Sequence, residues 1–202
     1  MGTQIEIIGF HGTTKNAADS IMDHGFRPSR GKGDWLGDGA YFWQDAPDRA
    51  WEWALGEARK QNQPPVTIRA RIKFRIGAPD QEEDLQYIDF LDISHETEVI
   101  DTYNALRAEY EETGWKLPRQ TRKKHRVDRL VIERLVRDYR LRGERIAAVR
   151  AAFHQEGKPI YVIERKKGKH EESAIYTRSQ VQIAVRDPEI ISDLRIERED
   201  LR

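Results

Sequence analysis

Cysteine is absent from this chain of 202 residues. Its absence excludes a disulfide scaffold, a thiolate nucleophile and every cysteine-based metal site at once. The six histidines form no His-x-x-x-His pair with a partnering carboxylate, the spacing that holds a catalytic zinc ion on one face of a helix. We therefore predict that the protein uses no catalytic metal.

Long apolar runs are missing as well. No segment approaches the roughly 20 apolar residues that a membrane-spanning helix needs. The first thirty residues lack the basic start and the apolar run of a secretory signal. We expect a soluble, cytoplasmic protein that does not contact a membrane, and its length is typical of one domain with or without an insertion.

The formal net charge is zero, but charges of opposite sign are separated along the chain. Residues 80–112 hold twelve acids and one base, whereas residues 116–150 hold thirteen bases and four acids. The densest basic run, residues 119–129, has three interpretations. One is salt-sensitive binding of nucleic-acid phosphates. The second, which we favour, is an acidic and a basic helix packed beside each other with solvated or paired charges. The third is a docking surface for a neutralising partner. The run comprises Arg119, Arg122, Lys123, Lys124, Arg126 and Arg129.

The first third of the chain alternates strands and helices. Residues 5–10 are rich in β-branched side chains and predict a strand that ends at Gly12. A short helix follows, capped by Asn16 and stopped by Gly25. Residues 28–40 are dense in Gly, Pro, Ser and Asp and are expected to form a loop.

A second helix and a second strand come next. The helix is expected to begin at Asp45 or Pro47, with an apolar stripe of Ala50, Trp53, Ala54 and Ala58. Residues 66–74 alternate apolar and polar side chains, which indicates a strand with one buried face.

The middle of the chain changes to a helical period. Residues 99–110 and 127–139 repeat apolar side chains at that period, so we predict a helical insertion over residues 80–150, formed as a hairpin. Strand patterns return at residues 160–164, 174–177 and 180–186, and Asp187-Pro188 ends the last of them. Strands at both ends around central helices predict a single α+β domain over residues 1–202.

The stretch GDWLGDGAYFW, residues 33–43, combines three glycines with four aromatic rings. It matches neither the dinucleotide-binding glycine pattern nor a P-loop, and by itself it is typical of a surface turn. Two further pieces change the interpretation. His11-Gly12-Thr13 follows the first predicted strand, and Gly39-Ala40-Tyr41-Phe42 begins the next about thirty residues later. This compound pattern resembles the ADP-ribosyltransferase superfamily of the histidine-tyrosine class, shared by poly(ADP-ribose) polymerases and diphtheria-like toxins.

The resemblance covers about the first 75 and the last 55 residues, and it fails at one position. The family carries a glutamate near the start of a late strand, whereas the late strand here reads QVQIAVRDP over residues 180–188. That segment, with VRAAFHQEG over residues 149–157, is similar to a bacterial branch of the superfamily. We assign Gln182 to the third catalytic position, with Gln180 as the alternative. Both lie on one face of a strand because side chains repeat every two residues.

The resemblance implies a split antiparallel sheet and transfer of ADP-ribose from NAD, used as a substrate, to a macromolecule inside the cell. It implies that His11 bonds a hydroxyl of the adenosine ribose, and that Tyr41 stacks on the nicotinamide ring. Gln182 would bond the 2'-hydroxyl of the nicotinamide ribose. NAD-binding positions carried over from the motifs are Gly12, Thr13, Gly39 and Gln180.

A second aromatic usually completes the nicotinamide sandwich from the following helix. Trp53 is our first choice and Trp51 the second; for both, ordinary core packing is the alternative. Because glutamine keeps the hydrogen bond of glutamate but cannot act as a general base, we expect single transfer and not chain formation. A toxin or antiphage effector, with a neutralising partner, is the biological role that the resemblance implies.

Two rival functions remain open. An RNA 2'-phosphotransferase of the same fold also uses His-Gly-Thr, but it carries more site arginines than the Arg27 and Arg30 found here. The other rival is a non-catalytic module that binds NAD or nucleic acid, for which the missing glutamate is the best argument.

Overall fold

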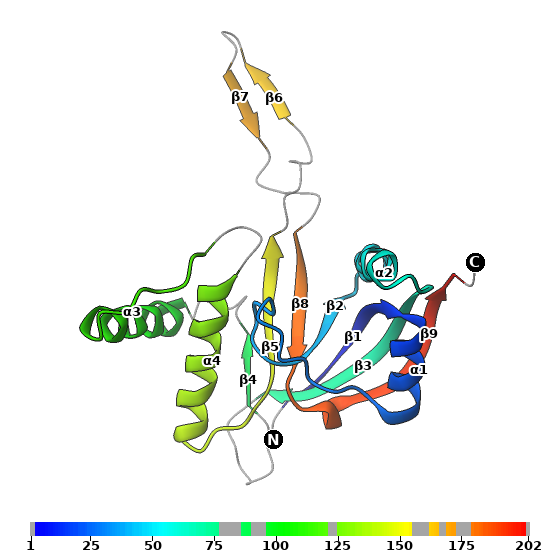
Figure 1. Cartoon of the computed structure of the whole chain (residues 1–202), viewed down its shortest axis with the longest axis horizontal. Coiled ribbons are helices and arrows are strands. Elements are labelled where there is room, and N and C mark those ends of the chain that lie inside the picture. The colour runs from blue at the N-terminus through cyan, green and yellow to red at the C-terminus, as the bar shows by residue number, and fades with distance from the viewer. Residues whose placement is uncertain are drawn as a thin grey trace.

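The fold is of the mixed α+β class, as the sequence predicts (Figure 1). The computed structural model describes residues 3–76, 86–89, 96–120, 125–154, 162–165, 169–172 and 179–200. The helices are α1 (Lys15–His24), α2 (Pro47–Gln61), α3 (Glu96–Glu112) and α4 (Arg126–Leu141), with a 3-10 turn at Pro188–Ile190. The strands are β1 (Thr3–Thr14), β2 (Ala40–Gln44), β3 (Pro65–Ile76), β4 (Gln86–Asp89), β5 (Ile146–His154), β6 (Val162–Arg165), β7 (Lys169–Glu172), β8 (Ser179–Val185) and β9 (Ile191–Glu199).

Seven strands form one sheet in the order β4-β5-β8-β2-β1-β3-β9, and β6 pairs with β7 in a separate two-stranded sheet. All neighbours in the large sheet are antiparallel except β4 and β5, which run parallel. Within the described residues, no helix is both long and apolar enough to cross a membrane.

The pairing of β1 with β2 is short and divides the sheet into two halves. β1 pairs with β3 along its whole length, from Thr3 to Thr14, but with β2 only at Gly9 and Phe10. β2 in turn pairs with β8 from Ala40 to Trp43. The ladder between the halves therefore ends beside His11, the first motif residue after it.

Helices cover both faces of this sheet. On one face, β3 buries Val66, Ile68, Ala70 and Ile72 completely, and their cluster includes Phe26 and side chains of α1. On the other face, α2 packs on β1 and β3, and α4 covers part of β5 and β8. Alternate residues of a strand point to opposite faces, so both faces of β2 and β8 are occupied.

The sequence predictions for these elements are largely confirmed, with local corrections. The predicted helical segments 99–110 and 127–139 lie inside α3 and α4. The first helix begins one residue after Thr14, so Asn16 is not its cap, although Gly25 does end it with a φ of 77°. β1 continues through Gly12 to Thr14, because β3 supplies backbone partners that far.

The second helix and the central region need two further corrections. α2 begins at Pro47, which excludes Asp45, and its buried side includes Trp51 in place of Trp53. Region 80–150 contains both predicted helices, but it also contains β4 and the start of β5, which join the large sheet. The predicted strand 174–177 lies outside the described residues.

The acidic helix and the basic helix pack against each other, as the favoured interpretation of the charge blocks expects. Arg134 of α4 contacts Glu109 of α3 at 2.8 Å, and the Tyr139 hydroxyl donates to Glu98. Figure 1 shows the two helices running in different directions, so they do not lie side by side as the hairpin that we predicted. Some charged side chains of each helix therefore contact the other helix and not a separate partner.

Candidate functional site

His11 lies where the two halves of the sheet separate. Its Nδ1 is 2.8 Å from the backbone oxygen of Tyr41, and its ring packs edge-on against Phe26 and tilted against Phe42. Because a carbonyl can only accept, Nδ1 carries the proton and Nε2 of the neutral ring is an acceptor. Burial lowers the pKa of His11, and the hydrogen bond to Tyr41 opposes this only in part. His11 is therefore a neutral imidazole at neutral pH, with an oriented acceptor nitrogen.

Tyr41 is fixed at both ends. Its backbone oxygen accepts from His11, while its hydroxyl donates to the Gly37 oxygen at 2.9 Å and accepts from the Leu36 nitrogen at 2.9 Å. Burial, together with the charge of Asp34, raises the pKa of the phenol well above its ordinary value. Tyr41 thus remains neutral and joins His11 to the loop over residues 34–37. Its stacking on nicotinamide stays a prediction.

Gln182 is almost fully buried, with 8% of its surface exposed, and its partner is Trp35. The indole Nε1 of Trp35 donates to Gln182 Oε1 at 2.7 Å. In the sheet, Gln182 lies opposite Trp43 of β2 and Ala151 of β5. Hydrogen bonds and the chain between Leu36 and Trp35 therefore link His11 to Gln182 through Tyr41. The His11 ring packs on the Phe42 side of the sheet, whereas the Gln182 side chain lies on the opposite side, beside Trp43.

Gln180, the alternative third position, lies on the same face two residues earlier. Its Oε1 is buried and has no hydrogen-bond partner among the described residues. It also lies beyond the stretch of β8 that pairs with β2, which begins at Gln182. Only Gln182 is therefore connected to the motif residues of β2.

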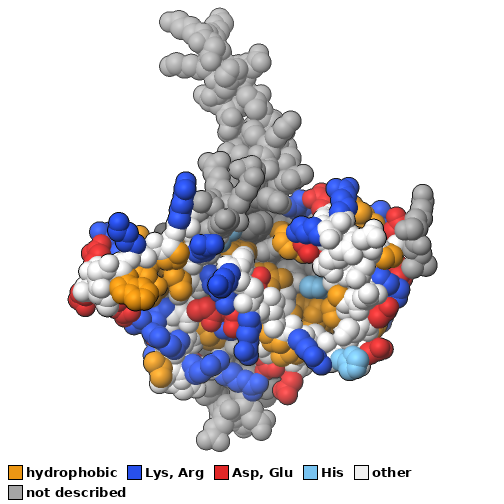
Figure 2. Space-filling model, viewed as in Figure 1, with side chains coloured by type: hydrophobic (Ala, Val, Ile, Leu, Met, Phe, Trp, Pro, Cys, Tyr) orange, Lys and Arg blue, Asp and Glu red, His pale blue; other side chains and the backbone are white. Residues whose placement is uncertain are grey.

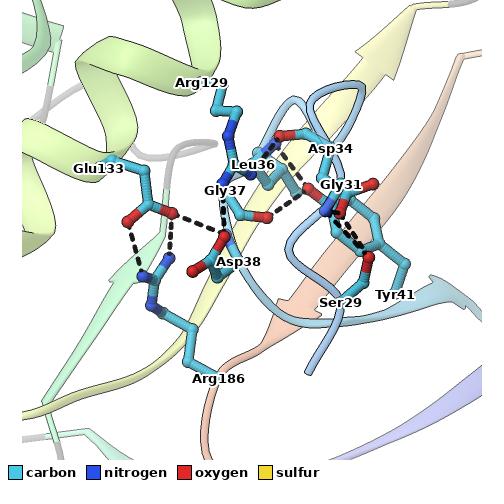
Figure 3. Close-up of polar contacts among 10 residues, drawn as sticks. All are labelled: Ser29, Gly31, Asp34, Leu36, Gly37, Asp38, Tyr41, Arg129, Glu133 and Arg186. Carbon is cyan, nitrogen blue, oxygen red and sulfur yellow. Dashed lines mark hydrogen bonds and ion pairs between the residues drawn. The ribbon is translucent and has the colours of Figure 1, made fainter. Parts of the chain in front are cut away.

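Helix α4 holds the glycine-rich loop in place (Figure 3). Glu133 accepts from the Asp38 backbone nitrogen at 2.6 Å and from both terminal nitrogens of Arg186, at 3.0 and 2.9 Å. Arg129, one turn earlier on α4, forms an ion pair with the Asp38 carboxylate and donates to the backbone oxygen of Asp34 at 3.4 Å. These contacts tie α4, the loop and the end of β8 into one polar cluster.

The start of the loop closes on itself. The Asp34 carboxylate accepts from the Ser29 hydroxyl at 2.6 Å and from the Gly31 nitrogen at 2.8 Å (Figure 3). Ser29 also forms a pair of backbone hydrogen bonds with Gly39, at 3.0 and 3.1 Å. Residues 29–39 are thus a closed loop whose base is the start of β2.

Three glycines of the motifs are required by packing. A Cβ on Gly12 would lie 1.9 Å from the Ala50 oxygen of α2, and one on Gly39 would lie 2.9 Å from the Ala184 backbone of β8. Gly37 has a φ of +81°, and its Cβ would lie 2.2 Å from a Glu133 oxygen. The glycines therefore let helix, strand and loop approach closely. The resemblance implied NAD binding for two of them, Gly12 and Gly39.

The two tryptophans of α2 differ sharply in exposure. Trp51 is buried and its ring lies 4.1 Å beneath the Arg198 guanidinium, whereas 56% of Trp53 is exposed. Core packing accounts for Trp51 but not for Trp53.

Thr13, another predicted NAD-binding residue, pairs with Val66 in the β1–β3 ladder.

Two surface cavities lie beside α4 and α2. One of about 440 Å³ is lined by Arg140, Arg145 and Arg186 at the far end of α4, and one of about 250 Å³ lies beside Pro47, Thr67 and Arg198. Neither is lined by His11, Tyr41 or Gln182. The predicted site is thus defined by its hydrogen-bonded residues and not by either cavity.

Sequence reasoning missed Trp35, Asp38, Glu133 and Arg186 as parts of this site. Arg186 belongs to the segment over residues 180–188, but the sequence pattern assigned no function to it. Arg129 and Glu133 have the i, i+4 spacing that places them on one helix face. Their partners are about 50 and 95 residues away in sequence, so no local pattern connects them.

Replacing Glu133 with glutamine is expected to lower the free energy of unfolding by about 1 to 2 kcal/mol. The amide oxygen can still accept from Asp38, but its NH2 group would face the Arg186 guanidinium, which can only donate. Chemical denaturation measures the loss. Glu111→Gln, which alters an exposed ion pair on α3, is the control and should change stability by less than about 0.5 kcal/mol.

The same variant has a predictable pH dependence. Burial opposes the charge on Glu133, but the hydrogen bonds from Arg186 and Asp38 outweigh it and lower the pKa of this carboxyl from its ordinary 4.5. A lowered folded-state pKa stabilises the fold above about pH 4.5, and the gain disappears as pH falls through the folded-state value. The stability difference between the two proteins should therefore shrink below that pH. A difference that stays constant would contradict the assignment of these contacts.

Comparison with known proteins gives no significant match to a family model, to a curated protein or to a solved structure. The chemistry of the site must therefore be argued from the residues of this chain.

Proposed function

We propose that this protein is an NAD-dependent mono-ADP-ribosyltransferase that modifies a macromolecule inside the cell, as a bacterial toxin or antiphage effector. The observation that carries the proposal is a series of contacts: His11 donates to the Tyr41 carbonyl, the Tyr41 hydroxyl accepts from the Leu36 nitrogen, and the adjacent Trp35 donates to Gln182. It joins the three residues that the sequence motifs single out. The short β1–β2 ladder beside His11 is consistent with the split sheet of this superfamily.

The reaction breaks the bond between nicotinamide and C1' of the ribose. Nicotinamide leaves as a neutral base with the electron pair of that bond, and the ribose carries developing positive charge as an oxocarbenium ion. An oxygen or nitrogen of the acceptor then bonds to C1', and any proton that it carries passes to solvent water. The protein's task is to position the two reacting groups and to stabilise the charge that develops.

His11 can bind a sugar hydroxyl without changing its protonation state. Its Nδ1 proton is engaged by the Tyr41 carbonyl, so Nε2 is left as an acceptor for a ligand O–H. Since its lowered pKa keeps the ring neutral, this acceptor is present throughout the neutral range. This supports the role of His11 toward the adenosine ribose.

Gln182 supplies an oriented amide but no proton transfer. Its oxygen has a second lone pair beside the one that faces Trp35, so it can accept from one ribose hydroxyl. Without a general base at this position, the acceptor must already be acidic or nucleophilic, such as a phosphate or a nucleic-acid hydroxyl. We therefore propose single transfer to such a group.

A nucleic acid is one acceptor that the basic run would suit. Arg119 and Arg126 are exposed, whereas Arg129 is used by Asp38, and residues 122–124 lie outside the described residues. Figure 2 shows Lys and Arg side chains across the face that carries α4 and the loop, with acidic side chains among them. A docked neutralising partner is the alternative use of this face.

Trp53→Ala is expected to raise KM for NAD by about 2- to 10-fold, with little change in kcat, because an exposed stacking ring contributes binding energy. Its neighbour is a matched control. Trp51→Ala should instead destabilise the fold by about 3 to 5 kcal/mol, since it empties a buried site. Steady-state kinetics and thermal unfolding of both variants decide the matter. An unchanged KM in Trp53→Ala would remove this residue from the NAD site.

One observation favours the non-catalytic rival. The Tyr41 hydroxyl and the Gln182 oxygen both have protein partners already, which is also how a purely structural cluster would look. Release of nicotinamide from NAD by the purified protein separates the two. Turnover supports the transferase, and NAD binding without turnover supports the module.

A further inference from the structure

The contact between Trp35 and Gln182 determines the orientation of the Gln182 side-chain amide, with its oxygen toward the Trp35 indole. An indole N–H can only donate, so the atom 2.7 Å from it must be the amide oxygen of Gln182. The two ends of a glutamine amide have nearly the same shape but opposite hydrogen-bonding character. Trp35 thus removes the ambiguity that any unpartnered glutamine would have.

We propose that Trp35 is a positioning residue that fixes the Gln182 amide with its oxygen toward the loop, so that this glutamine offers an acceptor as a carboxylate would. This inference rests on the proposed function. Developing positive charge on the ribose is stabilised by the oxygen end of an amide dipole and destabilised by the NH2 end. A glutamine free to rotate by half a turn would present the wrong end part of the time.

Trp35 is itself held on both sides. Both neighbouring residues have hydrogen-bonded backbone atoms. The Leu36 nitrogen donates to the Tyr41 hydroxyl, and the Asp34 backbone oxygen accepts from Arg129 of α4. Its ring also lies near that of His125 at the start of α4, with centroids 6.1 Å apart. The indole therefore belongs to the clamped part of the loop and not to an exposed tip.

A carboxylate needs no such device. Both oxygens of a glutamate accept, so a half-turn of the side chain changes nothing. The effect of removing the indole N–H should therefore depend on the residue at position 182. This dependence distinguishes a positioning role from a general effect of Trp35 on the loop.

The test is a double-mutant cycle on NAD turnover with Trp35→Phe and Gln182→Glu. Trp35→Phe keeps an aromatic side chain but removes the N–H donor. It should lower kcat about tenfold in the wild-type background, which corresponds to the free energy of one hydrogen bond. In the Gln182→Glu background the same change should lower kcat by less than about twofold. Trp115→Phe, at a tryptophan that is 75% exposed and follows the end of α3, is the control and should leave turnover unchanged.

An equal loss from Trp35→Phe in both backgrounds would overturn the proposal, and so would no loss in either. A second measurement is independent of activity. Exchange of the Trp35 indole proton with solvent, followed by NMR, should be slow in the wild-type protein and faster in Gln182→Ala. Fast exchange in the wild type would show that the contact is absent and overturn the positioning role. A protected indole in a protein that never cleaves NAD would instead refute the proposed function, and this inference with it.

Discussion

His11→Asn is expected to lower kcat/KM for NAD by about 100-fold or more while leaving the fold in place. The amide of asparagine can donate to the Tyr41 carbonyl as Nδ1 does, but it does not reach the position of Nε2. The change therefore separates the structural hydrogen bond from the proposed contact with the ribose. Circular dichroism and a turnover assay on the same sample measure both effects.

Two companion variants sharpen this test. His11→Gln can place a polar amide group near the position of Nε2 and should recover part of the activity. His11→Ala removes both contacts and the ring that packs against Phe26 and Phe42, so it should lose stability as well as activity. Full turnover in a folded His11→Asn protein would remove His11 from the site.

The pH profile gives a further expectation for His11. Because burial lowers its folded-state pKa, protonation of this residue opposes folding. Its contribution to stability is complete above the unfolded value of 6.5 and decreases as pH falls below it. In His11→Gln, which cannot titrate, this part of the acid destabilisation should be missing.

Gln182→Ala is the second change with a large expected effect, a loss of about 2 to 4 kcal/mol of transition-state stabilisation, seen as a 30- to 1000-fold lower kcat. The amide is buried, is held by Trp35 and is placed to bond the reacting sugar in the proposed mechanism. Gln182→Glu should keep or raise NAD cleavage, because a carboxylate accepts the same bond and adds negative charge near the oxocarbenium ion. It should also favour water over the natural acceptor.

Gln180 supplies the matched control for this prediction. It lies on the same face of β8, but it lies beyond the β2 pairing that includes Gln182. Gln180→Glu should therefore change turnover little. Loss of activity in Gln180 variants, with Gln182→Ala still active, would move the catalytic position by two residues. No effect at either position would leave the late strand a purely structural part of the sheet.

The sequence was sufficient for elements whose determinants are local. The alternation over residues 66–74 specified β3, and the helical periods in the middle third specified α3 and α4, because each pattern reflects one buried face. β9 was missed: its exposed, charged side chains leave no clear alternation, and its pairing with β3 defines it. The pairing of β4 beside β5 likewise depends on strands distant in sequence.

The candidate site divides in the same way. The compound motif predicted His11, Tyr41 and Gln182 as site residues, and hydrogen bonds link each of them to the loop or to one another. The residues that link them could be identified only from the structure. Trp35 meets a residue 147 positions away, and Glu133 meets Asp38 across 95. Gly12 and Gly39 were predicted to bind NAD, and the fold adds a packing reason for each: Gly12 makes room for α2 and Gly39 for β8.

Transfer of label from NAD carrying a labelled adenylate phosphate to total cell protein, RNA or DNA tests the central claim most directly. We expect the wild-type protein to release nicotinamide and to label one class of macromolecule. We also expect His11→Asn, folded to the same extent, to do neither. NAD that stays intact with the wild-type protein, or 2'-phosphate removed from RNA in place of a labelled product, would contradict the proposed transferase.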